Sequence, residues 1–239
     1  MKIIKKINIK KIRRYEKAYH DNLYNTKKLW EKWSWLANPI DSVIDALDYL
    51  SKKNISVLDI WCGVWRHAIP IAKAIQNKRG RVVWIDILDS AKIKFNENQK
   101  RNLIPKQSLL FKKTDIEDYI IQKESFDYIF AVSCLEHVSN VDNLDKVLKK
   151  ITNWTKKWWI NYIIISVDNT LFDPTHNTYL QPMVEINLKL NEAKKLLNKY
   201  YWKRKKIEFS TKLRESKQNH IKEFLIQKWN SIRLMYQKK

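Results

Sequence analysis

The residues best suited to hold a ligand stand at the ends of short apolar segments. Asp59, Asp86 and Asp115 each follow such a segment, and Ser133 ends another. In sheets of parallel strands, ligands bind outside the carboxyl ends of the strands, where these side chains would meet. Residues 55–67, ISVLDIWCGVWRH, have the form of a nucleotide-binding strand and loop with one glycine written in it. The spacing therefore predicts a site for a nucleotide-like ligand.

The elements that would position these residues alternate between helical and strand patterns. Apolar residues at helical spacing predict helices, and short continuous apolar runs predict buried strands. The expected order is helix 41–50, strand 55–60, helix 67–75, strand 81–87, helix 90–99, strands 108–112 and 126–133, helix 144–152 and strand 161–167. A Pro-containing stretch, 168–183, then leads to a helix at 190–200 and strands at 206–213, 224–227 and 232–236. This order indicates an α/β chain with a parallel sheet covered by helices on both faces.

Two segments resemble motifs of the class I S-adenosylmethionine (SAM) dependent methyltransferases. With glycine in place of Trp61 and Trp65, residues 57–67 read VLDIGCGVGRH, which is similar to the first motif of that family. Residues 126–138, FDYIFAVSCLEHV, resemble the fourth motif. The resemblance implies a doubly wound, Rossmann-like, mostly parallel seven-stranded sheet with antiparallel C-terminal strands. It divides the chain into a basic N-terminal extension, 1–40, and a methyltransferase domain, 41–239.

The resemblance also implies which residues would bind SAM around the first strand. Asp59 would orient the loop and reach the ammonium group of the cofactor, often through water. The loop itself would pass its backbone beneath the methionine and ribose portions. Its residues here are Trp61, Cys62, Gly63 and Trp65.

Further cofactor contacts are implied at the next strands. Asp86 would bind both ribose hydroxyls, because one carboxylate accepts two hydrogen bonds, and Ile87 would offer an apolar face to the adenine. Asp115 would accept from the exocyclic amine of the adenine while Ile116 packs on the ring. Ser133 and Cys134 would lie beside the transferred methyl group.

The sequence predicts no catalytic residue, because a sulfonium methyl group is already activated and the protein mainly aligns the nucleophile and excludes water. His137 is interpreted as a helix cap or structural residue, with a substrate-facing role as the alternative. Cys62 and Cys134 lack metal-ligand spacing and an obvious disulfide partner, so we expect no metal and a reduced, cytoplasmic protein.

The tryptophans suggest an altered genetic code. The chain has 2 Gly and 11 Trp in 239 residues, whereas average usage would give about 17 Gly. The family writes glycine where Trp61, Trp65, Trp84, Trp158 and Trp159 stand, and a hairpin turn would favour glycine at position 229. The hypothesis is that UGA codons for glycine were translated as tryptophan. The other interpretation is a true Trp-rich chain with a degenerate loop.

Charge and hydropathy restrict the partners. A net charge of +22 is typical of chains that bind nucleic acid, but the excess is mostly lysine, as an AT-rich genome would produce, so nucleic acid is not favoured. The first twenty residues lack a continuous apolar run, which argues against a signal or a membrane span. No oligomeric state follows from the sequence.

These observations together predict a SAM-dependent methyltransferase that acts on a small molecule. The segments GVWRHAIPIA and SVDN, at 63–72 and 166–169, resemble the tellurite-resistance methyltransferase group, which makes an oxyanion a candidate acceptor. A NAD-dependent dehydrogenase shares the strand, loop and acidic residue but not the LEHV element. The alternatives kept are a methyltransferase fold that binds no SAM, if the tryptophans are real, and an RNA-directed protein.

Overall fold

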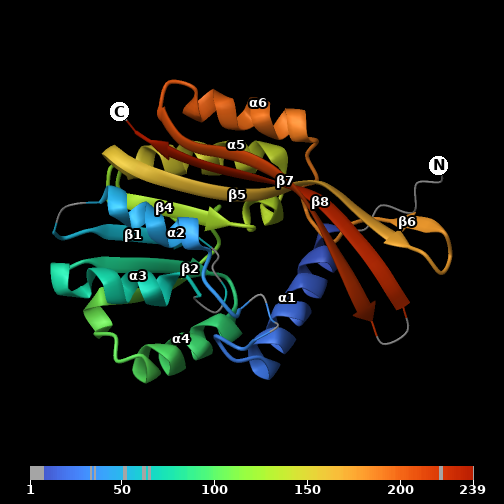
Figure 1. Ribbon diagram of the computed structural model, residues 1–239, viewed down its shortest axis with the longest axis horizontal. Coiled ribbons are helices and arrows are strands. Elements are labelled where there is room, and N and C mark those ends of the chain that lie inside the picture. Colours follow the sequence, from blue (N-terminus) through green and yellow to red (C-terminus); the bar gives the residue numbers. More distant parts are fainter. Residues whose placement is uncertain are drawn as a thin grey trace.

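The centre of the molecule is one eight-stranded sheet. The computed structural model describes residues 8–238 except 33, 35, 51–52, 61–62, 64–65 and 221–222; of 217–220 and 223–224 it describes the backbone alone. The sheet has the strand order β3-β2-β1-β4-β5-β8-β7, with β6 paired to β5 (Figure 1). The strands are β1 Ser56–Ile60, β2 Arg81–Asp86, β3 Leu109–Lys113, β4 Phe126–Val132, β5 Thr155–Asp173, β6 Thr178–Leu180, β7 Lys205–His220 and β8 Glu223–Gln237.

The pairing of the strands confirms the doubly wound α/β fold. Strands β1 to β5 pair in parallel, and β6, β7 and β8 join in antiparallel pairs. The order turns back on itself between β1 and β4, so the carboxyl ends of these strands face a crevice where ligands bind in open α/β sheets. The fold thus matches the expectation, with the short β6 as an eighth strand.

Helices cover both faces of the sheet. They are α1 Ile9–Thr26, α2 Asp41–Asp45, α3 Ala68–Ile75, α4 Asp89–Arg101, α5 Val141–Trp154 and α6 Leu190–Tyr201. Helices α5 and α6 pack on one face, and α2, α3 and α4 pack on the other. In the part of the chain that is described, no helix has both the length and the apolar character needed to cross a membrane.

The strands alternate their side chains between these two layers. In β2, Val83 and Ile85 join the core under α5 and α6, whereas Val82 and Trp84 join the core under α3 and α4. The Trp84 ring is fully buried and stacks on Phe95 of α4 with ring centroids 5.5 Å apart. Because both faces are covered, the strand must be apolar throughout, which is why it reads as a continuous run.

The C-terminal part differs from the sequence prediction. Strands β7 and β8 are two long strands in place of the three expected at 206–213, 224–227 and 232–236. Trp229 was expected in a tight turn, but it lies inside β8 opposite Arg214, so that prediction is wrong. The 168–183 stretch is also partly strand, since β5 continues to Asp173 and pairs with β6. Polar residues in these two-stranded extensions hide the strand pattern.

Among the tryptophans that the structure describes, two have a backbone conformation that favours glycine. Trp30 has a φ of 70° and Trp158 a φ of 69°. A bulky residue in this left-handed region is a conformational outlier, because its Cβ approaches the following carbonyl oxygen. Trp84, in contrast, lies in the ordinary strand β2. At position 84 the glycine hypothesis therefore depends on the family resemblance alone.

Candidate functional site

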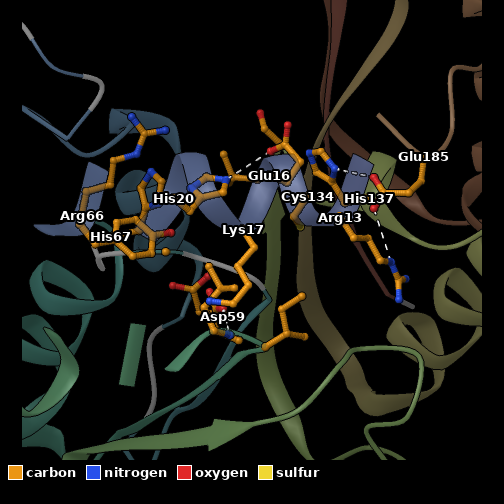
Figure 2. Close-up of a pocket in the computed structure, with 17 residues that line it drawn as sticks. Arg13, Glu16, Lys17, His20, Asp59, Arg66, His67, Cys134, His137 and Glu185 are labelled. Carbon is orange, nitrogen blue, oxygen red and sulfur yellow. Dashed lines mark hydrogen bonds and ion pairs between the residues drawn. The ribbon is translucent and has the colours of Figure 1, made fainter. Parts of the chain in front are cut away.

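A cavity of about 340 Å³ lies at the carboxyl ends of β1, β2 and β4, beneath helix α1 (Figure 2). Pockets of a few hundred Å³ are typical of small-molecule sites. Five residues predicted from the sequence line it together: Asp59, Gly63, Asp86, Ile87 and Ser133.

The end of β1 provides a buried carboxylate and one loop glycine. Asp59, the penultimate residue of the strand, is 1% exposed. Gly63 is buried with a φ of 58°, a left-handed conformation that glycine adopts without steric cost. The predicted loop residues Trp61, Cys62 and Trp65 lie outside the described residues.

The end of β2 provides a second buried carboxylate. Asp86 is 5% exposed, and its Oδ1 accepts a hydrogen bond from the backbone N–H of Leu88 at 2.9 Å. Burial raises the pKa of Asp86 to about 6, although the N–H groups of Leu88 and Gly63 and the nearby His20 act to lower it. The next side chain, Ile87, is 39% exposed and also faces the cavity. The pair thus offers an acceptor and an apolar surface side by side.

Asp115 and Ile116 do not line the cavity. The Asp115 carboxylate accepts from the backbone N–H of Glu117 at 3.0 Å and lies 3.8 Å from Arg13 of α1. Ile116 is fully buried in the core under α5. The structure therefore does not bring this pair to the other predicted residues, and their contact with adenine stays a prediction.

The end of β4 places Ser133 and Cys134 on the cavity wall. Ser133 has a φ of 50°, and its N–H donates to the carbonyl of Ile164 at 2.8 Å, which extends the β4–β5 ladder. The Cys134 thiol donates to the carbonyl of Ile60 at 3.3 Å. Burial raises the pKa of Cys134 well above its ordinary value, so the thiol is protonated and is no nucleophile.

A charged network that the sequence did not reveal occupies one end of the cavity. His137 Nδ1 lies 2.8 Å from Oε2 of Glu185, whose Oε1 lies 3.5 Å from Nε of Arg13. Burial alone would lower the pKa of His137, but the bond to Glu185 and the nearby Glu136 and Glu16 raise it to about 9. His137 is therefore an imidazolium at neutral pH, held by a carboxylate, and it faces the cavity.

Helix α1 forms the roof of the site. Five residues of one helix face line the cavity: Arg13, Glu16, Lys17, His20 and Tyr24. Their spacing of three, four and seven is the signal in the sequence that would have indicated a common face. No short-range pattern connects that face to the strands, so sequence reasoning left it out of the site.

Both ends of α1 are fixed to the domain. At its C-terminal end, Tyr24 packs with Leu88 and Ala91, and Asp21 accepts from Ser90 of α4 at 2.5 Å. At its N-terminal end, Arg13 lies within 4 Å of three carboxylates, those of Asp115, Glu117 and Glu185. The helix therefore crosses the cavity from β2 to the segment that follows β6.

The opposite end of the cavity from His137 carries two further basic residues. Arg66 and His67 directly precede α3, and both line the cavity (Figure 2). Burial lowers the pKa of Arg66, an effect that the Asp59 carboxylate opposes. Burial, together with the charge of Arg66, lowers the pKa of His67 to about 3, so its imidazole is neutral.

Comparison with known proteins supports this fold. Residues 57–157 match a family described as a methyltransferase domain. A SAM-dependent methyltransferase from Methanosarcina mazei has a similar structure, with a TM-score of 0.57 and 14% sequence identity over 84% of this chain and 98% of that chain. The N-methyltransferase NodS from Bradyrhizobium japonicum, solved with S-adenosyl-L-homocysteine, has a TM-score of 0.54 and 13% sequence identity over 96% of this chain and 97% of that chain.

One similar structure has another activity. The [4+2]-cyclase SpnF has a TM-score of 0.59 and 13% identity over 85% of this chain and 74% of its own. Among curated proteins, none matches the sequence. At such identities the structures establish the fold, and the fold alone does not fix the reaction.

The fold and the cavity define a class I methyltransferase architecture. Within it, residues 57–157 are similar to a methyltransferase domain, and this match indicates SAM as the cofactor.

Proposed function

We propose that the chain is a SAM-dependent methyltransferase that acts on a small molecule. The observation that carries the proposal is the convergence of Asp59, Gly63, Asp86 and Ile87 on one cavity with Ser133. They come from the ends of three neighbouring parallel strands, which is where the fold binds ligands. A cavity of about 340 Å³ that α1 covers favours a small acceptor over a macromolecule.

The residues present suit this cofactor. When bound, SAM supplies a methyl group already activated on a sulfonium. Asp86 would accept hydrogen bonds from the two ribose hydroxyls, and Ile87 would pack on the adenine. Ser133 and Cys134 would flank the reacting centre, and α1 would exclude water from it.

The acceptor proposed first is an oxyanion, as the resemblance to the tellurite-resistance group suggests. Support comes from the cationic His137 and from Arg13, which lie at one end of the cavity. Both are partly neutralised by Glu185, so a charged acceptor would compete with that carboxylate. A SAM turnover assay tests this narrower proposal: sodium tellurite and sodium selenite should compete with each other as methyl acceptors.

We propose further that positions 61, 65, 84, 158 and 159 are glycine in the organism. The left-handed φ at Trp158 supports this assignment, and that at Trp30 adds position 30 as a candidate. Mass spectrometry of the protein from its native source reads these positions directly. Glycine there supports the proposal, and tryptophan refutes it and favours a fold that binds no SAM.

Calorimetry on two forms of the chain tests the function. The tryptophan form has the printed sequence, and the glycine form has Gly at positions 61, 65, 84, 158 and 159. We expect the glycine form to bind SAM and Asp86→Ala in that form to weaken binding about 100-fold, because two hydrogen bonds to a charged group are lost. Asp48→Ala, at an exposed aspartate, is the matched control. Failure of the glycine form to bind SAM refutes the proposal.

Two other predictions remain proposals. The 1–40 extension contains α1, so we propose that this segment belongs to the site as well as preceding the domain at 41–239. A cytoplasmic location is supported by Cys134, a buried free thiol. Binding of RNA at moderate salt would instead support the RNA-directed alternative.

A further inference from the structure

A second cavity, of about 400 Å³, lies under the N-terminal turns of helix α1. Ile9 and Ile12 of α1 line this second cavity, whereas Arg13 and later residues of α1 line the first. Glu185 lines both cavities. The two cavities therefore meet at Glu185 and form two compartments beneath one helix.

The wall of the second cavity is mainly apolar, and Glu185 is the only charged side chain among the described residues that line it. The apolar side chains come from α1, from the start of α5 and from the segment after β6; they are Ile9, Ile12, Val141, Ile186 and Leu188. The remaining lining residues are Ser139, Asn140, Gln181 and Asn187. Such a wall suits an uncharged, mainly apolar molecular body, because burial of a charge without a partner costs free energy.

The boundary between the two cavities carries a hydrogen-bond donor that faces the first. Nδ1 of His137 lies 2.8 Å from Glu185 (Figure 2), so Nε2 is the ring nitrogen left to donate to a ligand. His137 lines the first cavity and is an imidazolium at neutral pH. A ligand oxygen that accepts from Nε2 therefore meets a charge-assisted donor, the stronger kind of hydrogen bond.

The room in the first cavity limits what it can hold. Its volume of about 340 Å³ is near the lower end for a site that binds one small ligand. A methyltransferase must hold its cofactor and its acceptor together. With the cofactor against Asp59 and Asp86, an organic acceptor that starts at His137 extends past Glu185 into the second cavity.

The reacting group of the acceptor should be nucleophilic without first losing a proton. A hydroxyl or an ammonium group must give up a proton before it attacks, and His137 is already protonated while Glu185 is held by two cations. A carboxylate needs no such step. One of its oxygens would attack the methyl carbon as the carbon–sulfur bond breaks and its electron pair passes to sulfur, which gives a methyl ester and S-adenosylhomocysteine.

We propose that the acceptor is a carboxylic acid with an apolar body, whose carboxylate accepts from His137 and whose body occupies the second cavity. The proposal rests on the proposed function and narrows its oxyanion to an organic one. Inorganic oxyanions share the head group but have no apolar body. Dependence of binding on the length of an apolar chain therefore separates the two classes.

Straight-chain probes test the body and the head group in turn. Calorimetry with butanoate, hexanoate, hexanol and hexylamine is done on the form of the chain, tryptophan or glycine, that binds S-adenosylhomocysteine, with that product present. Hexanoate should bind about 15-fold more tightly than butanoate, the factor for two buried methylene groups. It should bind about tenfold more tightly than hexanol, the factor for a charged acceptor of one hydrogen bond. Incubation of hexanoate with SAM should yield methyl hexanoate.

Two variants locate these preferences. Val141→Trp narrows the second cavity at an exposed position of α5 and should reduce the advantage of hexanoate over butanoate from about 15-fold to about twofold. His137→Gln combined with Glu185→Gln removes both charges together and should abolish the preference for hexanoate over hexanol. Ile93→Trp, at an exposed position of α4 that lines neither cavity, is the matched control for Val141→Trp. Binding of S-adenosylhomocysteine within about twofold shows that each variant is folded.

The outcomes separate the two proposals. Equal affinity for butanoate and hexanoate, or an advantage of hexanoate that survives Val141→Trp, overturns the role of the second cavity. Tighter binding of hexanol or hexylamine than of hexanoate overturns the carboxylate. In both cases S-adenosylhomocysteine still binds, so the proposed function stands. Failure of S-adenosylhomocysteine to bind either form refutes the proposed function, and titration of hexanoate into the ligand-free protein then decides the second site by itself.

Discussion

Replacement of Asp86 by asparagine should stabilise the ligand-free protein while destroying its cofactor site. The carboxyl is 5% exposed at the end of β2, and burial raises its pKa from 3.8 to about 6. A carboxyl with a higher pKa in the folded state than in the unfolded state binds its proton more tightly when folded. Ionisation therefore costs stability, and this cost develops as the pH rises from about 4 to about 6 and then stays constant.

The magnitude follows from the two pKa values. A rise from 3.8 to about 6, at 1.36 kcal/mol per pH unit, corresponds to about 3 kcal/mol at pH 7.5 and to about 1 kcal/mol at pH 4.5. Asparagine removes the charge and keeps an oxygen that can accept from the N–H of Leu88. The hydrogen bond to this neutral oxygen is weaker than the bond to a carboxylate. The difference offsets about 1 kcal/mol, which leaves a gain of about 2 kcal/mol at pH 7.5.

Urea unfolding of the unsubstituted chain and of Asp86→Asn, at pH 4.5 and pH 7.5 without ligand, measures this gain. Asp48→Asn, at an exposed position, is the control and should change little at either pH. The reasoning fails if Asp86→Asn is no more stable than the unsubstituted chain at pH 7.5, or if its advantage does not grow with pH. A gain in stability, together with a loss of SAM binding when the same substitution is made in the glycine form, would show that the buried charge is retained for binding.

Three further outcomes are expected. The affinity of the glycine form for S-adenosylhomocysteine should fall about tenfold per pH unit below pH 6, because protonation of Asp86 removes the carboxylate; calorimetry at pH 5, 6 and 7 with a pH-independent affinity would contradict this. Glu185→Gln should lower the pKa of His137 from about 9 by roughly one or more, because it removes the carboxylate partner of the imidazolium; an unchanged NMR titration would contradict the network. Trp158→Gly should stabilise the chain by about 1 kcal/mol, since it relieves a left-handed φ of 69°, whereas Trp202→Gly, at a similarly exposed position with an ordinary φ of −61° just after α6, should not; denaturant unfolding compares the two.

The sequence predicted the Rossmann-like half of the fold well, because buried parallel strands are apolar on both faces. The range expected at 81–87 corresponds to β2, Arg81–Asp86, and the range at 190–200 to α6, Leu190–Tyr201. The antiparallel strands β7 and β8 were harder to predict from the sequence. One side of β7 is open to solvent, so its polar residues gave no continuous signal, and Trp229 suggested a turn where β8 continues.

The part of the site that follows strand ends was also predictable, since Asp59, Asp86 and Ile87 stand directly after apolar runs. The network of Arg13, His137 and Glu185 was not. These residues are far apart in the sequence, and their meeting depends on how α1 crosses the sheet. Local patterns carry no information on such a crossing, because it is set by packing between distant elements.

The position of α1 has a consequence for the order of folding. The helix is synthesised before the strands of the sheet, yet Arg13 pairs with Glu117, 104 residues later, and with Glu185 beyond that. Contacts across such distances close large loops and form slowly compared with local ones. A nascent chain can therefore pair β1, β2 and β4 while α1 still lacks its partners. We expect the cavity to be completed late, after residue 185 has left the ribosome, so that ligand-binding competence follows formation of the parallel sheet.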